Sequence, residues 1–198
     1  MDSVLFFKIQ FIIIFFIWVG VRYYFSSKIN QKVSESIRPC IEKTLVFLNI
    51  VGQIIIPMII MFTPFFDQFK IGINTILKQI LVFVSLINIL FYAKIFLDLG
   101  QSWSPILELK EDHKLVTSGV YKYVRHPMYT HFWLWAISQG IILDNYLVLI
   151  PGVLFWAMLY FFRVSKEEDM MTQRFGFEYE LYMQTTPRII PFTKCICK

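Results

Sequence analysis

Hydrophobic positions in this chain gather into long runs that polar segments separate. The first three runs each have about the 20 residues that a helix needs to cross a bilayer, and the last two are slightly shorter. Only Asp144 and Asn145 separate the last two runs, which favours a tight helical hairpin. The pattern therefore predicts five transmembrane helices, over residues 4–21, 44–66, 75–97, 128–143 and 146–162.

Prolines and polar residues predict where these helices bend or end. Pro57 predicts a kink in the second helix, and Pro64 predicts its end. Residues 99–124 form the longest polar segment, and the apolar residues scattered through it favour an ordered loop. From Arg163 the chain is polar again, which predicts a separate amphipathic helix to about Gln184.

The composition supports this membrane architecture. Hydrophobic residues make up 57% of the chain and aromatic residues 18%, whereas soluble domains are about 45–50% apolar. We therefore expect an all-α integral membrane protein with a single domain over residues 1–198. Residues 1–98 would hold the three N-terminal helices, and residues 99–198 the last two helices with the amphipathic helix.

Positive charge predicts how the helices are oriented. Most of the 19 Lys and Arg residues lie in the polar segments 22–43 and 99–126 and in the tail from residue 163. These three segments share one side of the membrane if five helices span it. Because basic loops stay in the cytoplasm, the N-terminus is expected outside and the C-terminus in the cytoplasm.

Several classes of site are disfavoured by residue types and spacing. Cys40, Cys195 and Cys197 form neither a disulfide framework nor a metal set, and the roles of the last two stay open. His113, His126 and His131 lack the spacing of a metal site. The glycines are too far apart for a dinucleotide-binding loop, and the basic residues are too scattered for a nucleic-acid surface.

The most informative polar cluster precedes the fourth helix. Arg125 and His126 stand directly before Pro127, a residue suited to the first turn of a helix, where a polar or anionic ligand can be held. The hairpin would place Arg163 and Glu167 beside them. Taken singly, Arg125 also fits a membrane anchor, and Arg163 with Glu167 also fits an ordinary helix salt pair.

An ordered set of motifs carries a family resemblance. The runs are G-V-Y-K-Y-V-R-H-P-M-Y, F-F-R-V-S-K-E-E, R-F-G-F-E-Y-E-L-Y and P-R-I-I-P, with H-K-L-V upstream. Over residues 113–191 the chain resembles the isoprenylcysteine carboxyl methyltransferase family, especially its short prokaryotic or archaeal members. That family is related to the membrane phospholipid methyltransferases. One position departs from the family pattern, since His131 stands where a glycine is expected.

The resemblance implies S-adenosylmethionine as the methyl donor, with S-adenosylhomocysteine as product. The cytosolic loop and tail would hold this cofactor, with Glu167 taking its ammonium and Arg125 or His126 its carboxylate. Arg163 and Glu167 would be the catalytic residues, while Arg163 and Trp133 would contact the acceptor. The expected cofactor-binding residues are His113, Lys114, Leu115, Val116, Tyr121, Arg125, His126, Pro127, Met128 and Glu167.

The leading hypothesis is methyl transfer to the α-carboxylate of a prenylcysteine-like, lipidated acceptor. An α-carboxyl with a pKa of about 3.3–3.7 is ionised at neutral pH, so it needs no general base. The first alternative is an amine methyltransferase acting on a phospholipid or other lipid headgroup, for which Glu168 would matter. The second is a non-catalytic membrane scaffold or transport subunit. Membrane lipids are expected partners, and neither nucleic acid nor metal is.

Overall fold

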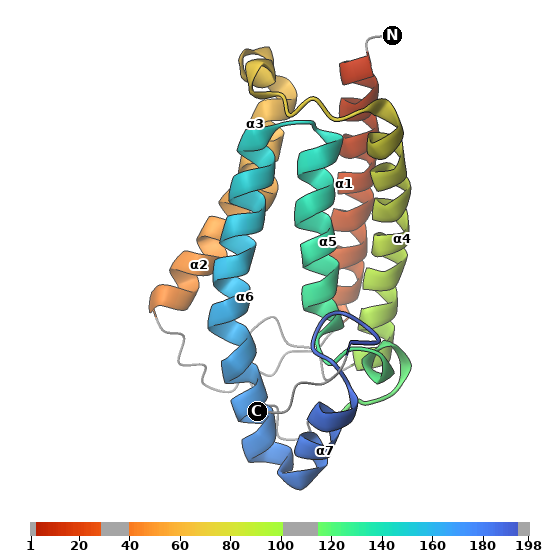
Figure 1. The fold of residues 1–198 in the computed structure, drawn as a ribbon, viewed down its shortest axis with the longest axis vertical. Helices are drawn as coiled ribbons and strands as arrows, with labels where there is room; N and C mark the ends of the chain where they lie inside the picture. The colour runs from red at the N-terminus through yellow and green to blue at the C-terminus, as the bar shows by residue number, and fades with distance from the viewer. Residues whose placement is uncertain (1–2, 29–39, 101–114, 194–198) are drawn as a thin grey trace.

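The computed structural model describes residues 3–28, 40–100 and 115–193, and these form a bundle of helices (Figure 1). At one end of the bundle, here the far end, lie the start of α1 and the α5–α6 turn. The opposite end, here the site end, holds the start of α5 and all of α7. The α-helices are α1 (Ser3–Ser27), α2 (Cys40–Ile50), α3 (Ile56–Phe62), α4 (Thr75–Leu99), α5 (Pro127–Ile142), α6 (Tyr146–Phe175) and α7 (Phe177–Thr185).

The helices confirm an all-α integral membrane protein. In the described part of the chain, four helical segments are long and apolar enough to span a bilayer: Val4–Ser27, Ile41–Phe62, Thr75–Leu99 and Tyr146–Phe175. Helix α5 has 16 residues and is about 24 Å long, which is short of the apolar thickness of a bilayer. The five-span count therefore stays a prediction.

The second hydrophobic run is a helix with a modified middle. A π-helical turn, η1 (Val51–Ile55), joins α2 to α3 directly before Pro57. The proline has no N–H and its ring would crowd the carbonyl of Gln53, so a wider turn relieves the clash. Helix α3 ends at Phe62, two residues before Pro64, which confirms that this proline marks the helix end. Pro64 then begins a 3₁₀ helix, η2 (Pro64–Phe69), which the sequence did not predict.

Helix α5 packs against both α4 and α6 and is tied to α1 and α4 by His131. This side chain is fully buried. The indole Nε1 of Trp18 donates to His131 Nε2 at 2.9 Å, so the neutral ring carries its proton on Nδ1. That Nδ1 lies 3.1 Å from Asn88 Oδ1, and the ring of Tyr92 stacks on the imidazole at 4.0 Å. His131 is thus a structural crosslink between helices.

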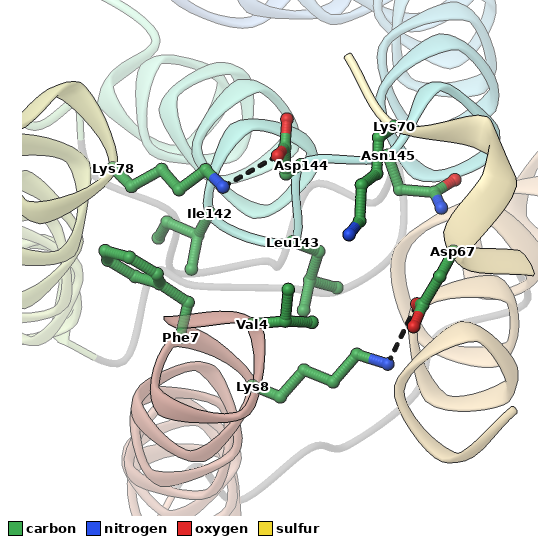
Figure 2. Close-up of a pocket in the computed structure, with 10 residues that line it drawn as sticks. All are labelled: Val4, Phe7, Lys8, Asp67, Lys70, Lys78, Ile142, Leu143, Asp144 and Asn145. Atoms are coloured by element: carbon green, nitrogen blue, oxygen red, sulfur yellow. Dashed lines mark hydrogen bonds and ion pairs between the residues drawn. The ribbon is translucent and has the colours of Figure 1, made fainter. Parts of the chain in front are cut away.

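Ion pairs close the far end of the bundle. Asp144, in the α5–α6 turn, lies 2.7 Å from the amine of Lys78 in α4, while Lys8 in α1 lies 3.2 Å from Asp67 (Figure 2). Asp144 also accepts hydrogen bonds from the backbone N–H groups of Gly72 and Ile73. These contacts fix the hairpin turn and with it the register of α5 against α6.

The sequence prediction was wrong about the end of α6. We expected one helix to end at residue 162 and an amphipathic helix led by residues 166–169 to follow it, but α6 continues without a break to Phe175. The chain turns at Gly176, whose φ of 53° favours glycine, and α7 then begins at Phe177. Residues 163–175 include no proline or glycine to break the helix. The change from apolar to polar residues at Arg163 therefore marks a change in the solvent around α6 and not a helix end.

We predict that His131→Gly lowers the thermal unfolding midpoint in detergent. The change leaves Trp18 and Asn88 without their buried partner and opens a void beside Tyr92, a cost of about 2–4 kcal/mol. Tyr146→Phe, at an exposed site on α6, serves as the control and should leave the midpoint unchanged. An unaltered midpoint in His131→Gly would contradict the crosslinking role.

Candidate functional site

The start of α5 is bound by the C-terminal tail. The backbone N–H groups of Arg125 and His126 donate to the carbonyls of Pro187 and Arg188, at 2.8 and 2.9 Å. One turn into the helix, the Thr130 hydroxyl donates to the carbonyl of Ile189 at 2.7 Å. The backbone N–H groups of Arg125 and His126 are therefore already paired and are not available to a ligand.

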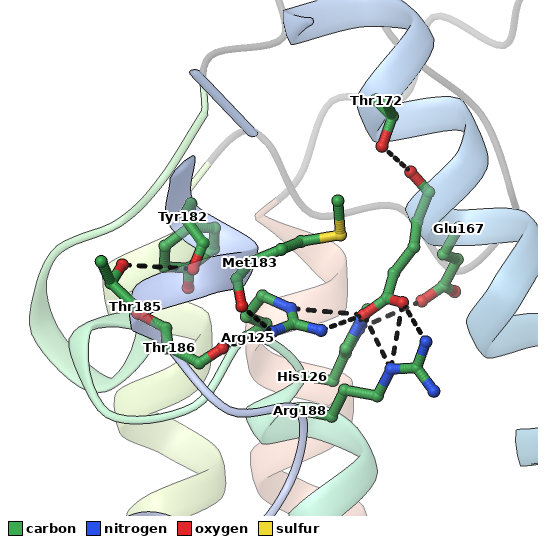
Figure 3. A network of polar contacts seen from close by, with 10 residues as sticks. Arg125, His126, Glu167, Thr172, Tyr182, Met183, Thr185, Thr186 and Arg188 are labelled. Atoms are coloured by element: carbon green, nitrogen blue, oxygen red, sulfur yellow. Dashed lines mark hydrogen bonds and ion pairs between the residues drawn. The ribbon is translucent and has the colours of Figure 1, made fainter. Parts of the chain in front are cut away.

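The carboxylate of Glu168 is the centre of the polar network at this end. Figure 3 shows Arg125, His126 and Arg188 converging on one carboxylate, which belongs to Glu168. Arg125 Nη2 lies 2.7 Å from Glu168 Oε1, His126 Nε2 lies 3.1 Å from the same oxygen, and Arg188 Nη2 lies 2.5 Å from Oε2. The Glu168 side chain is only 7% exposed. Its three basic partners compensate its buried negative charge.

This network joins four segments that are distant in the sequence. Arg125 Nη1 donates to the carbonyls of Met183 and Thr186, so α5, α6, α7 and the tail meet at one guanidinium. The hydrogen bond to Glu168 raises the pKa of the Arg188 side chain above its ordinary value. All three side-chain nitrogens of Arg125 donate hydrogen bonds within the protein, so the guanidinium stabilises the fold.

Arg163 has a different environment, although it lies on the same helix as Glu168. Its Nη2 lies 3.5 Å from Glu167 Oε1, one turn along α6, and its Nε lies 3.7 Å from Glu42 Oε1 of α2. Both distances exceed the roughly 2.7–2.9 Å of a charge-assisted hydrogen bond. The Nε atom is buried and has no hydrogen-bond partner among the described residues. Arg163 is therefore a partly buried cation whose buried Nε is an unused donor.

Other buried polar atoms on α5 and α6 also lack partners. The Tyr129 hydroxyl and the indole N–H groups of Trp133 and Trp156 are buried without a hydrogen bond in the described part of the chain. The rings of Tyr129 and Trp156 lie 5.7 Å apart between centroids, and Tyr160 contacts both Tyr129 and Trp133. We name Tyr129, Trp133, Trp156, Tyr160 and Arg163 the Arg163 cluster. The aromatic rings of this cluster lie on α5 and α6 and pack in one hydrophobic cluster with Leu45 of α2.

The loop before α5 is anchored to α4 through Asp98. The Asp98 carboxylate accepts the backbone N–H of Val120 at 2.9 Å. Gly119 has a φ of 62° and leaves no room for a Cβ against that carboxylate, so the motif begins with glycine for a steric reason. Burial raises the pKa of the Tyr121 hydroxyl, and the Tyr121 carbonyl accepts a hydrogen bond from Tyr182 of α7.

The structure brings together most of the residues that the sequence singled out. His126 Nδ1 lies 3.6 Å from Glu167 Oε2, which links the Arg125–His126 pair to Arg163 and Glu167 across the hairpin. Pro127 and Met128 form the first turn of α5, and Trp133 lies one turn beyond Tyr129. Leu115 and Val116 are half-buried in the loop. His113, Lys114, Cys195 and Cys197 lie outside the described residues.

Sequence reasoning missed the central role of Glu168 and assigned no role to two further residues of this site. Glu168 was grouped with Arg163 and Glu167 and was given a role only for an amine acceptor, and its central position depends on the exact rotation of α6. Arg188 was noted within a tail motif but was given no role. Glu42 lies at the start of an apolar helix more than a hundred residues from Arg163, and no local pattern indicates that contact.

Part of the sequence is similar to a known family. Residues 77–173, just under half of the chain, match the model of the isoprenylcysteine carboxyl methyltransferase (ICMT) family. The chain is 40% identical over 97 residues to a protein-S-isoprenylcysteine O-methyltransferase of Schizosaccharomyces pombe, covering 46% of this chain and 40% of that protein. A Xenopus laevis protein of the same name is 34% identical over 126 residues, covering 60% and 44%. The matches thus span less than half the length of these relatives.

A solved structure extends the likeness to the fold. The eukaryotic intramembrane Ras methyltransferase ICMT superposes with a TM-score of 0.57 at 26% sequence identity. The superposition covers 81% of this chain and 55% of the other. It therefore includes helices beyond the residues that match the family model.

We predict unequal stability losses for the two neighbouring glutamates of α6. Glu168→Gln leaves Arg125 buried without its countercharge and should lower the thermal midpoint strongly, at a cost of about 3–5 kcal/mol. Glu167→Gln, whose partners lie at 3.5 Å or beyond, should cost less than about 1 kcal/mol. Thermal unfolding of both variants in one detergent compares them directly, and equal losses would refute the distinction.

Proposed function

We propose that this protein methylates the α-carboxylate of a prenylcysteine-like, lipidated acceptor at the membrane–cytosol interface. The observation that carries the proposal is Arg163, a partly buried cation whose buried Nε has no hydrogen-bond partner among the described residues. A buried donor of this kind is costly unless a ligand satisfies it. The names of the relatives, protein-S-isoprenylcysteine O-methyltransferases, supply the chemical class of that ligand.

The unpartnered atoms favour a carboxylate acceptor over an amine. Arg163 Nε and the indole nitrogens of Trp133 and Trp156 can only donate. An amine acceptor would have to lose a proton before it could react, and Glu168 was the residue considered for that task. Glu168 is instead bound by Arg125, His126 and Arg188, so its carboxylate is poorly placed to take a proton. An ionised carboxylate needs none.

Glu167 has the properties required to bind the ammonium group of S-adenosylmethionine. Its side chain is 26% exposed, and its described ion pairs with His126 and Arg163 are longer than hydrogen bonds. The carboxylate therefore retains capacity for a cationic ligand. When bound, the cofactor supplies an electrophilic methyl group on a positively charged sulfur and leaves as S-adenosylhomocysteine.

We propose that the remaining wall of the cofactor site comes from the loop before α5 and the first turn of that helix. The Arg125 guanidinium is already bound to Glu168, so it would shape the site and hold Glu168 in place. The His126 ring faces Glu167. This proposed wall comprises His113, Lys114, Leu115, Val116, Tyr121, Arg125, His126, Pro127 and Met128.

The residues of the Arg163 cluster would hold and orient the acceptor. The Arg163 guanidinium would bind the carboxylate, and the nearby Tyr129 hydroxyl would add a second donor. Trp133 and Tyr160 would pack against the apolar part of the acceptor, which approaches from the lipid. Fixing the carboxylate and excluding water from it are the contributions of the protein that accelerate such a reaction.

The proposed orientation places the site end in the cytoplasm and the N-terminus outside. In the described part of the chain, the starts of α2 and α5 and the end of α6 lie together at this end (Figure 1). These segments adjoin the basic stretches that the positive-inside rule assigns to the cytoplasm.

We predict that Arg163→Ala and Glu167→Ala separate the two binding functions. Arg163→Ala should lower kcat for a farnesylcysteine analogue by at least about a hundredfold and retain most of the affinity for S-adenosylhomocysteine. Glu167→Ala should weaken that affinity by about tenfold or more. Calorimetry in detergent and transfer of labelled methyl measure the two effects, and equal losses of affinity in both variants would overturn the roles.

The same assay tests the alternatives with the unaltered protein. Base-labile label on the farnesylcysteine analogue indicates an ester and supports the proposal. Stable label on phosphatidylethanolamine, with none on the thioether acid, would establish an amine methyltransferase instead. A chain that binds no S-adenosylhomocysteine would be a scaffold, and both enzyme hypotheses would fail.

A further inference from the structure

Glu42 is a buried acidic residue that the family match does not reach. Glu42 lies in the first turn of α2 and is 5% exposed. The family model begins at residue 77, so the contact between Glu42 and Arg163 comes from the N-terminal half of the chain. A buried carboxylate at a membrane helix end is costly, which favours a function for it.

Arg163 is positioned between Glu42 and Glu167. Its Nε lies 3.7 Å from the Glu42 carboxylate and its Nη2 lies 3.5 Å from the Glu167 carboxylate. The two distances are nearly equal, and neither is a hydrogen bond. The guanidinium is attracted to both sides and closes on neither, which explains how it retains an unused donor inside the protein.

The pair on α6 would behave differently without Glu42. Arg163 and Glu167 are four residues apart on one helix face, a spacing at which an arginine and a glutamate form a direct salt bridge. If the charge of Glu42 were removed, attraction to Glu167 alone would draw the guanidinium across the gap. That bridge would occupy the cation proposed for the acceptor and the carboxylate proposed for the cofactor.

We propose that Glu42 is a positioning residue that keeps Arg163 apart from Glu167 and thereby keeps both groups available. This role rests on the proposed function, because it assigns Arg163 to an anionic acceptor and Glu167 to a cationic group. It adds a requirement for α2, which the motifs of the C-terminal half do not include. The N-terminal helices would then contribute to the site as well as to the fold.

A structural role for Glu42 is the alternative that the experiment must exclude. Helix α2 packs against α6, so a substitution in this interface can alter stability alone. Asn49 offers a matched control, since it is also buried on α2 and its Nδ2 donates to the carbonyl of Phe155 in α6 at 2.8 Å. Asn49→Ala should therefore weaken the same helix pair without changing the charge around Arg163.

The test compares Glu42→Gln, Glu42→Asp and Asn49→Ala in the full chain. Glu42→Gln should raise KM for the farnesylcysteine analogue and weaken S-adenosylhomocysteine binding, each by about tenfold. Glu42→Asp retains the charge and should restore part of both losses. Asn49→Ala should lower the thermal midpoint and leave KM and the affinity of the folded protein unchanged.

Three results would overturn the inference. Glu42→Gln with unaltered KM and affinity would show that Arg163 needs no second carboxylate. Matching effects in Glu42→Gln and Asn49→Ala would show that α2 acts through packing alone. An unaltered protein that binds S-adenosylhomocysteine but methylates no carboxylate would refute the proposed function, and with it this role for Glu42; normal wild-type activity distinguishes the first two results from that failure.

Discussion

The ion pairs of Glu168 are the interaction on which the site depends. One buried carboxylate binds Arg125 and His126 from the start of α5 and Arg188 from the tail, so segments far apart in the sequence converge at the end of a helical hairpin. The continuity of α6 makes this geometry rigid, because the same helix carries Arg163 and both glutamates out of the apolar layer. Breaking the pairing would leave a charge buried without compensation.

The contrast between Glu168 and Arg163 separates structure from function. Charged residues are abundant at this end of the bundle, and a sequence motif does not distinguish those that support the fold from those that bind a ligand. Hydrogen bonding does. Arg125 is saturated by Glu168 and by carbonyls of α7 and its C-terminal end, whereas Arg163 lies beyond hydrogen-bond distance of two carboxylates. The underbonded residue is the one suited to an exchanging ligand.

The sequence predicted the helices well because hydrophobic runs and prolines report local constraints. It also predicted that Arg125, His126, Arg163 and Glu167 lie close together, because a tight hairpin places the start of one helix beside the end of the other. It failed where the answer depended on helix rotation or on distant partners. The change to polar residues at Arg163 reflects contact with solvent, but it was interpreted as a helix boundary. His131 departed from the family pattern, and only the contacts with Trp18 and Asn88 show that it crosslinks helices. Glu42 had no local signal at all.

We propose that Arg163 binds the carboxylate of the acceptor, and a structure of the complex would identify the group that does so. The protein would be solved with S-adenosylhomocysteine and a farnesylcysteine analogue, and the nearest cation to the acceptor carboxylate would be identified. We expect a carboxylate oxygen within about 2.7–3.2 Å of an Arg163 nitrogen, with Glu168 still bound to Arg125. A carboxylate bound to Arg125 or Arg188, with Arg163 bridged to Glu167, would contradict it.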